Sequence, residues 1–472
     1  MTELGGKISA LMPRARRDLA ELVAIPSVAD PLQYRPQECR RAAQWVADAF
    51  TEAGFRDVHL AETPDGSHAV LGHRPPPHGA PTVLLHCHYD VHPPLDESAW
   101  TSPPFTLTER DGRWYGRGAA DCKGNIVMHL TALRALGEDI PVGLKFVADG
   151  SEEQGTGALE QYVAEHPEQF LADAALVCDT GNAEAGTGSA TVSLRGRASL
   201  VVTVETLRRP VHAGMFGGPA PDALAALIQL LASLRDPDTG ATRVNGLDCA
   251  GSWGGAGYDA ERFRTDAGVL DGVRLTGASA SAAASAGPGT GTGTEGAAAA
   301  GSVADDLWAR PAVTVLGIDC PPVVGSREAV PARVRARVSL RVPPGTEPAA
   351  ALAALTEHLT DAVPWGARVS VEPEGAVAPF RAATDGPAYA ALGSAMRQVY
   401  GKPLVFLGQG GAIPLCTVLA EAFPRAEIVL MGVAEPSCRI HAPDESVDPA
   451  EIEHMAHVEA LFLREYAAAR RR

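Results

Sequence analysis

The sequence predicts an α/β protein of two domains in which the second domain is inserted into the first. Three observations predict this arrangement. From about Arg40 to Cys178, within a first domain part predicted at residues 1–194, strand-like and helix-like segments alternate, which is typical of a layered α/β fold. Residues 195–378 contain segments that alternate apolar and polar side chains, as antiparallel strands with one solvated face do. The α/β pattern then returns over residues 379–472, so the first domain is split in sequence.

The elements of the split domain follow in chain order. Apolar residues at helical spacing, among them Leu11, Leu19 and Leu22, predict an amphipathic helix near the N-terminus. Residues 123–137 predict a helix that ends on a glycine. Short apolar runs predict buried strands at residues 81–87, 142–147, 174–178 and 427–432.

The inserted domain has a different pattern of apolar and polar residues. Residues 199–205 and 332–341 predict antiparallel strands, and residues 222–234 between them predict a helix. Residues 277–301 consist largely of Ala, Ser, Gly and Thr and lack the apolar mass that would order them. This segment is therefore predicted to be a flexible surface loop without a catalytic role.

Length and charge limit the classes of function. With 472 residues the chain exceeds what one core usually fills, which supports two domains. Its 57 acidic and 40 basic residues give a formal charge of −17, so neither nucleic acid nor a membrane is an expected partner. Residues 1–25 contain no long apolar stretch, which argues against a signal peptide or membrane span. The eight cysteines form no CxxC pair, and a reduced, cytoplasmic protein is expected.

A histidine and an aspartate close the first predicted strand. His88 and Asp90 are two residues apart, so strand alternation puts them on one face. Asp90 can then accept the second N–H of the imidazole and fix its tautomer, which metal-binding histidines require. A lone His-x-Asp is also common on protein surfaces, so this pair needs further support.

Further candidate ligands occur at other segment ends. Asp121 lies in a glycine-bracketed turn before a predicted helix, where an aspartate is often only an N-cap. Glu152, Glu153 and Asp179 follow predicted strands, and His441 lies in the loop after another. Each of these has an ordinary explanation as a turn or surface residue.

The combination is more informative than its members. The candidates gather at the carboxyl ends of predicted parallel strands, where open α/β sheets bind their ligands. Two histidines and three carboxylates, with two further carboxylates beside them, suit Zn²⁺, Mn²⁺ or Co²⁺. The absence of a thiolate from this set argues against a structural zinc site.

The order of motifs resembles the di-zinc aminoacylase/carboxypeptidase family of metallopeptidases. Within that family it is most similar to the branch that contains cytosolic non-specific dipeptidase and carnosinase. The resemblance covers nearly the whole chain outside residues 277–301. It implies a phosphorylase/hydrolase-like metallopeptidase domain, an inserted α+β lid/dimerisation domain and a homodimer. The motifs are HxDV at 88–91, GRGxxDxKG at 116–124, EE at 152–153, Asp179, RG at 195–196, HxGxFGG at 212–218, GGxIP at 410–414 and HxPxE at 441–445.

The resemblance also implies a ligand set. His88 and Asp179 would hold one divalent cation, Glu153 and His441 the other, and Asp121 would bridge them. Two Zn²⁺ ions are expected, with Mn²⁺ or Co²⁺ as alternatives. Two metals that share one bridging carboxylate would lie close enough to bind and activate the same hydroxide. That hydroxide would cleave a peptide bond next to a free C-terminal carboxylate.

Catalytic and substrate-binding roles follow from the same resemblance. Asp90 and Glu152 are the predicted catalytic residues: Asp90 orients His88, and Glu152 acts as general base and acid. His212 would stabilise the oxyanion of the tetrahedral intermediate. In the related enzymes, the corresponding histidine reaches the active site from the other subunit of a dimer. Arg341 would bind the free carboxylate of the substrate through its planar guanidinium.

Several positions depart from the family pattern. Cys122 stands where Asp or Met is frequent, and Glu328 stands where related dipeptidases carry Thr. Ala412, a predicted substrate-binding position in the GGxIP loop, replaces a frequent serine. Residues 408–409 are Gly-Gln where Arg-Glu is expected. Because none of these is a predicted metal ligand, they bear on substrate preference and leave catalysis intact.

Other interpretations stay open at this stage. The substrate could be a small dipeptide or an N-acyl amino acid, so a deacylase, a desuccinylase or a carboxypeptidase of the same family is the alternative to a dipeptidase. Residues 86–88 also resemble the HxH strand of TIM-barrel amidohydrolases, but the antiparallel insert and the Glu pair contradict that fold. A non-catalytic binding protein on the same fold would be expected to have lost Glu152 or a ligand.

Overall fold

The computed structural model describes residues 3–277 and 302–470. They form two compact units. The split unit comprises Met1–Val192, Ala382–Leu407 and Pro414–Arg472, and the inserted unit comprises Ser193–Arg381 and Gly408–Ile413. The short run Gly408–Ile413 groups with the inserted unit, which the sequence pattern did not indicate. Most of the predicted loop at 277–301 lies outside the described residues.

A large mixed sheet is the centre of the split unit. Its middle strands β6, β3, β7 and β17 are parallel neighbours, and they confirm the four buried strands that the apolar runs predict. Parallel strands covered on both faces read as continuous apolar runs, which is why the sequence revealed them. In sheet order the strands are β1 (Arg56–Glu62), β2 (His68–Arg74), β6 (Gly143–Asp149), β3 (Thr82–His88), β7 (Ala174–Cys178), β17 (Glu427–Met431), β8 (Ser189–Leu194) and β15 (Phe380–Arg381), with β16 (Val405–Gln409) also paired to β8.

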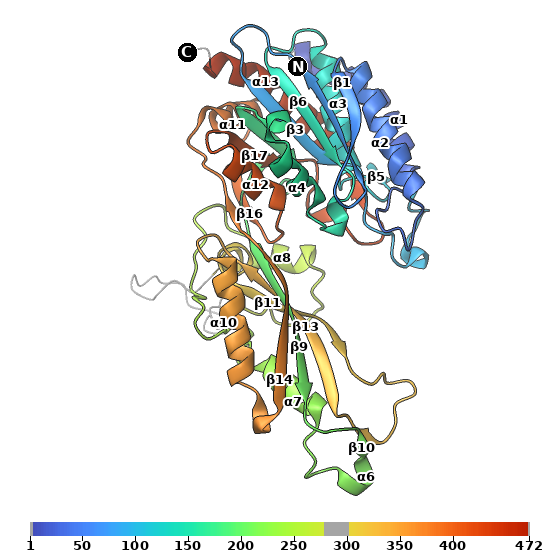
Figure 1. The fold of residues 1–472 in the computed structure, drawn as a ribbon. Coiled ribbons are helices and arrows are strands. Elements are labelled where there is room, and N and C mark those ends of the chain that lie inside the picture. The colour runs from blue at the N-terminus through green and yellow to red at the C-terminus, as the bar shows by residue number, and fades with distance from the viewer. Residues whose placement is uncertain (1–2, 278–301, 471–472) are drawn as a thin grey trace. The chain divides into compact units, whose positions relative to one another are not determined.

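Helices pack on this sheet and on one another (Figure 1). The predicted helices at the N-terminus and at 123–137 are confirmed as α1 and α3, and α3 ends before Gly137, whose φ is 59°. A small sheet of β18 (Ser446–Val447), β5 (Arg113–Tyr115) and β4 (Thr108–Arg110) lies in the same unit. The helices are α1 (Glu3–Val23), α2 (Pro36–Glu52), α3 (Lys123–Leu136), α4 (Ala158–Glu165), α5 (Pro167–Phe170), α11 (Pro387–Tyr400), α12 (Pro414–Ala422) and α13 (Pro449–Arg470).

A buried lysine joins the first helix to the body of the unit. Lys123, the first residue of α3, is fully buried. Its Nζ donates to the carbonyl oxygens of Leu22 and Ile25 at 2.9 and 2.7 Å. These carbonyls lie at the end of α1, where the last turn lacks internal donors, so the lysine caps the helix from outside.

The inserted unit is built on a four-stranded antiparallel sheet. The strand order is β11 (Ala312–Asp319), β13 (Arg333–Val342), β9 (Gly196–Glu205) and β14 (Arg368–Val377). Strands β9 and β13 confirm the two predicted antiparallel strands. Helix α7 (Ala223–Ala232) confirms the predicted helix between them, and the side chain of Asp222 caps its N-terminus. The remaining elements are β10 (Val211–His212), α6 (Ala213–Phe216), α8 (Ala260–Asp266), β12 (Ala329–Val330) and α10 (Pro348–Asp361).

Across residues 3–277 and 302–470, no helix combines the length and the apolar character needed to cross a bilayer.

A fully buried ion pair joins two helices of the split unit. His129 on α3 lies 2.8 Å from Glu459 on α13, and neither side chain is exposed. Burial alone would lower the pKa of His129, but the Glu459 carboxylate raises it above its usual value. The pair therefore favours the folded state while His129 is protonated, and this contribution declines as pH rises through the raised pKa of His129.

The substitution Glu459→Gln tests this pair. Removing one partner of a buried ion pair leaves the other charge unpaired, so we expect a loss of about 3–5 kcal/mol in the free energy of unfolding at pH 6. The loss should shrink as the pH is raised, because deprotonated His129 no longer needs a counter-charge. Urea unfolding monitored by circular dichroism at several pH values measures it. Asp319→Asn, which removes an exposed partner of Arg335, is the control and should cost less than about 1 kcal/mol. A loss that is independent of pH would contradict the assignment of the charge to His129.

Candidate metal centre

The first group of candidate ligands converges at the ends of two neighbouring strands. His88 ends β3, and Asp179 directly follows β7, which pairs with β3 in parallel. Both side chains therefore reach the same sheet edge. The Nε2 atom of His88 lies 3.2 Å from Asp179 Oδ1 and 3.0 Å from Asp121 Oδ1. His88 is fully buried, so solvent does not screen these contacts.

The second group meets the first at Asp121. His441 Nε2 lies 3.1 Å from Asp121 Oδ2 and 3.1 Å from the carboxylate of Glu153. Asp121 thus directs one oxygen toward each of two imidazoles, His88 and His441. Asp121 therefore lies between the two groups of candidate ligands, and its predicted role as a metal bridge stays a prediction.

Asp90 connects His88 to the turn that carries the glutamate pair. The Nδ1 atom of His88 lies 3.2 Å from Asp90 Oδ1 and 3.1 Å from the Asp90 carbonyl oxygen. The Asp90 carboxylate also accepts hydrogen bonds from the backbone N–H groups of Glu152 and Glu153, at 3.2 and 3.0 Å. The sequence predicted the contact with His88 but not the second pair of contacts. One side chain therefore orients an imidazole and fixes the position of both glutamates.

The site concentrates more acidic than basic groups in a buried volume. Burial raises the pKa values of Glu153 and Asp179, and it raises the pKa of Glu152 to about 9. Hydrogen bonds to Asp121 and Glu153 raise the pKa of His441 to about 10. These shifts all show that the carboxylates need positive charge nearby, here supplied by protons.

The residues present fit a pair of divalent cations. Two groups of side chains bring ligand atoms within 4.8 Å of one another: His88 with Cys122 and Asp179, and His88 with Asp121 and Glu153. Imidazole nitrogen with several carboxylate oxygens is the donor set that Zn²⁺, Mn²⁺ and Co²⁺ accept. Cations would also favour the charged forms of Glu152, Glu153 and Asp179, whose pKa values are raised mainly by burial.

Cys122 lies close to His88 and Asp179, and the sequence did not predict this proximity. Its thiol donates to the Cys178 carbonyl oxygen at 3.0 Å and accepts from Asn125 Nδ2 at 3.3 Å. Burial raises its pKa to about 11, so it is a neutral thiol that already has a partner. Cys87 and Cys178, which adjoin His88 and Asp179 in sequence, are fully buried.

Three predicted substrate-binding residues belong to the inserted unit. His212 lies on the short ribbon of β10 and β12, is exposed, and accepts a hydrogen bond from Gly214 N at Nδ1. Arg341 lies on β13 directly opposite Arg197 of β9, and burial lowers its pKa. Ala412 lies in the run Gly408–Ile413. The structure thus brings together the seven candidates of the split unit, and the roles of all ten predicted site residues remain predictions.

Sequence reasoning missed residues that support the ligands. The ring of His92 stacks on that of His441, with centroids 4.6 Å apart. Arg117 and Glu445 form a fully buried ion pair beside Asp121. Arg117 and Glu445 were visible in the sequence, because Arg117 belongs to the GRGxxDxKG motif and Glu445 to the HxPxE motif. A linear motif, however, does not indicate which residue a charged side chain contacts.

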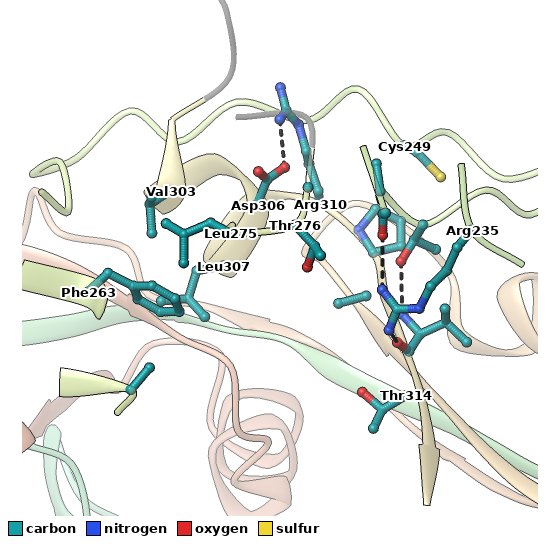
Figure 2. Close-up of a pocket in the computed structure, with 18 of the residues that line it drawn as sticks. Arg235, Cys249, Phe263, Leu275, Thr276, Val303, Asp306, Leu307, Arg310 and Thr314 are labelled. Atoms are coloured by element: carbon teal, nitrogen blue, oxygen red, sulfur yellow. Dashed lines mark hydrogen bonds and ion pairs between the residues drawn. The ribbon is translucent and has the colours of Figure 1, made fainter. Parts of the chain in front are cut away.

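A separate pocket of about 550 Å³ lies within the inserted unit (Figure 2). Apolar side chains, among them Phe263, Leu275 and Leu307, line it on one side. Two of its arginines have partners within the unit: Arg310 pairs with Asp306, and Arg235 donates to the carbonyls of Gly240 and Val313. No candidate metal ligand lines this pocket, so it is not the site of the predicted reaction.

Comparison with known proteins identifies the family. Residues 84–465 match the Peptidase family M20/M25/M40. This chain belongs to that family. The match confirms the predicted resemblance to metallopeptidases and the predicted enzyme class.

Relatives with similar sequences and structures cover almost the whole chain. The chain is 41% identical to a cysteinylglycine-S-conjugate dipeptidase of Corynebacterium striatum over 97% of each protein. It is 28% identical to a Beta-Ala-His dipeptidase of Rattus norvegicus, covering 87% of this M20 chain and 85% of the relative. The crystal structure of human carnosine dipeptidase 1 superposes with a TM-score of 0.81 at 25% identity, over 98% of both chains. The mixed α/β architecture predicted for this M20 peptidase is confirmed.

The position of Cys122 leads to a test of the ligand set. Because its thiol is neutral and hydrogen-bonded within the core, Cys122→Ala should lower the thermal midpoint of unfolding and leave the metal content unchanged. Metal content is measured by plasma emission spectrometry after dialysis against Zn²⁺ and gel filtration, with Cys87→Ala as the control for loss of a buried thiol. A folded Cys122→Ala protein that has lost one metal per chain would make the thiolate a ligand.

Proposed function

We propose that this metal-dependent dipeptidase cleaves dipeptides of the cysteinylglycine type next to their free carboxylate, by means of two divalent cations in the His88–Asp121–His441 cluster. The observation that carries the proposal is Asp121, whose two carboxylate oxygens each approach a different imidazole. A carboxylate shared in this way suits two cations held side by side.

The proposed ligand assignment follows the contacts. His88 and Asp179 would hold one cation and Glu153 and His441 the other, with Asp121 shared between them, because these side chains lie in contact with one another. When bound, the two cations supply the activation of a water molecule and the polarisation of the scissile carbonyl. Zn²⁺ is the expected metal, with Mn²⁺ and Co²⁺ as alternatives.

Glu152 is the proposed general base and acid. Its backbone is held by Asp90, while its side chain forms no hydrogen bond to a described residue and is free to act on substrate. Burial, followed by the nearby Asp179, raises the pKa of Glu152 when the site holds protons alone. Two bound cations would lower that pKa again, and the resulting carboxylate would accept a proton from the attacking water. The same carboxyl group can then deliver that proton to the leaving amine.

Substrate recognition is assigned to the inserted unit. Arg341 has no carboxylate partner among the described residues, and burial and Arg197 both disfavour its charge, so an incoming carboxylate would relieve an unbalanced guanidinium. His212 is the proposed donor to the oxyanion, and Ala412 lines the side of the substrate that carries its carboxylate. A homodimer and a cytoplasmic location, the latter in keeping with eight free cysteines, complete the proposal.

The substrate class rests on the relatives. The Corynebacterium striatum protein, similar over nearly the whole length, is named for cysteinylglycine S-conjugates, and the similar Schizosaccharomyces pombe protein for Cys-Gly. Other relatives are named for Beta-Ala-His. Because the identity is higher to the first relative than to the β-alanyl group, we assign α-dipeptides with a small C-terminal residue.

A substrate panel with a matched catalytic variant tests the proposal. The chain, reconstituted with Zn²⁺ or Mn²⁺, should hydrolyse Cys-Gly and its S-conjugates faster than β-Ala-His, Cys-Gly amide or an N-succinyl amino acid, with release of glycine followed by chromatography. Glu152→Gln should keep two metals per chain and lose at least ~10²-fold in kcat, because it removes proton transfer and leaves the ligands in place. Faster cleavage of the N-succinyl compound would favour a deacylase, and near-normal turnover by fully metallated Glu152→Gln would remove Glu152 from the mechanism.

His212 provides a test of assembly as well as of mechanism. Loss of one oxyanion donor typically lowers kcat by ~10²–10³-fold, so His212→Ala should be nearly inactive yet fully metallated. If His212 acts on the site of a partner subunit, mixing His212→Ala with Glu152→Gln creates heterodimers in which one of two sites is intact. Since half of the dimers in an equal random mixture are heterodimers, activity should approach one quarter of wild type. No recovery despite demonstrated subunit exchange would assign His212 to its own subunit, and an active His212→Ala would exclude the role.

A further inference from the structure

The loop that carries His441 has an unfavourable backbone. Arg439, His441 and Asp444 have φ values of 53°, 63° and 59°, in the left-handed region that side chains other than glycine rarely adopt. Each such residue costs free energy, and an arrangement of this kind persists only when surrounding contacts hold it. The position of His441 is therefore imposed by the neighbours of the loop.

Arginines from one adjoining segment hold both sides of this loop. Arg113 on β5 pairs with Glu435 at 2.7 Å before His441, and Arg117 pairs with Glu445 at 2.7 Å after it. The strand β18 that follows the loop also pairs with β5. The loop is thus fixed against the segment that leads into the Asp121 turn.

Glu445 makes contacts that a simple ion pair does not need. Its side chain is fully buried. Oε2 accepts from Arg117 Nη1 at 2.7 Å and from Gly118 N at 3.0 Å. Oε1 accepts from the backbone N–H groups of Ala120 and Asp121, at 3.0 and 3.1 Å. One carboxylate therefore accepts hydrogen bonds from three backbone amides of the turn that carries Asp121.

We propose that Glu445 is a positioning residue for the metal centre, fixing Asp121 and His441 relative to each other. Glu445 lies four residues after His441 in the same loop, and its carboxylate is hydrogen-bonded to the backbone of the Asp121 turn. His441 Nε2 and Asp121 Oδ2 lie 3.1 Å apart and must address the same cation, so a shift in either segment would separate them. The inference rests on the proposed ligand assignment and goes beyond it, because Glu445 itself contacts neither ligand side chain.

The ion pair of His129 and Glu459 offers a matched comparison. Glu459 is as fully buried as Glu445 and is also paired to a basic side chain, but its only described hydrogen bond is to His129. A role confined to stability predicts the same consequences for both carboxylates. A positioning role predicts that only Glu445 changes metal binding.

The experiment compares Glu445→Gln with Glu459→Gln in the full chain. A glutamine amide at position 445 turns an N–H₂ group toward either Arg117 or the turn amides, so at least one donor loses its acceptor. Dissociation constants for Zn²⁺ are measured by competition of the metal-free proteins with a chelator, and unfolding of the metal-free proteins is measured in urea. We expect both variants to be less stable than wild type, Glu445→Gln to bind Zn²⁺ 10- to 100-fold more weakly, and Glu459→Gln to keep its affinity within about threefold.

Different results separate the two levels of the proposal. Failure of wild type and Glu459→Gln to bind two Zn²⁺ ions would refute the proposed metal centre itself. Wild-type Zn²⁺ affinity in Glu445→Gln would refute the positioning role and leave the metal centre in place. If Glu445→Gln does not fold, Glu445→Asp retains the charge opposite Arg117 but is too short to reach all three amides. It should then show the same weakened affinity, and unchanged affinity in that variant would overturn the inference.

Discussion

The contact on which the site depends is the one that Asp121 makes with two imidazoles at once. His88 comes from the end of a central strand, and His441 comes from a loop more than three hundred residues further along the chain. Only a carboxylate with one oxygen near each can join them into one site. The parallel sheet supplies His88 and Asp179 at a common edge, and everything else near the site brings Asp121, Glu153 and His441 to that edge.

Holding so many carboxylates together is electrostatically unfavourable, and the fold compensates with fixed hydrogen bonds. Asp90 accepts from the amides of Glu152 and Glu153, and Glu445 accepts from the amides of the Asp121 turn. Buried acids that bind backbone N–H groups in this way keep their positions without a metal. Burial nevertheless raises the pKa values of Glu152 and Asp179, so their charged forms would be favoured by nearby cations.

The departures from the family pattern fall outside the ligand set. Cys122 follows Asp121 in sequence, yet its thiol donates to the Cys178 carbonyl oxygen, so a change of residue type there is accommodated within the core. Ala412 and Glu328 belong to the inserted unit, which carries the residues assigned to substrate recognition. In the proposed function, the residues of the metal centre therefore belong to the split unit and those assigned to substrate recognition to the inserted unit.

The sequence by itself determined the fold class, the buried parallel strands and the identity of the candidate ligands, because these leave local marks: continuous apolar runs, glycine-bracketed turns and acidic or histidine residues at strand ends. It did not reveal that Asp90 holds the Glu152 turn, that Cys122 lies beside His88, or that Glu445 binds the backbone of the Asp121 turn. Those facts depend on contacts between segments far apart in the chain, and residue spacing carries no information about which backbone amide a distant carboxylate will meet. Tertiary packing alone decided them, since burial forced each charged group to find its partners among whatever donors the folded chain placed within reach.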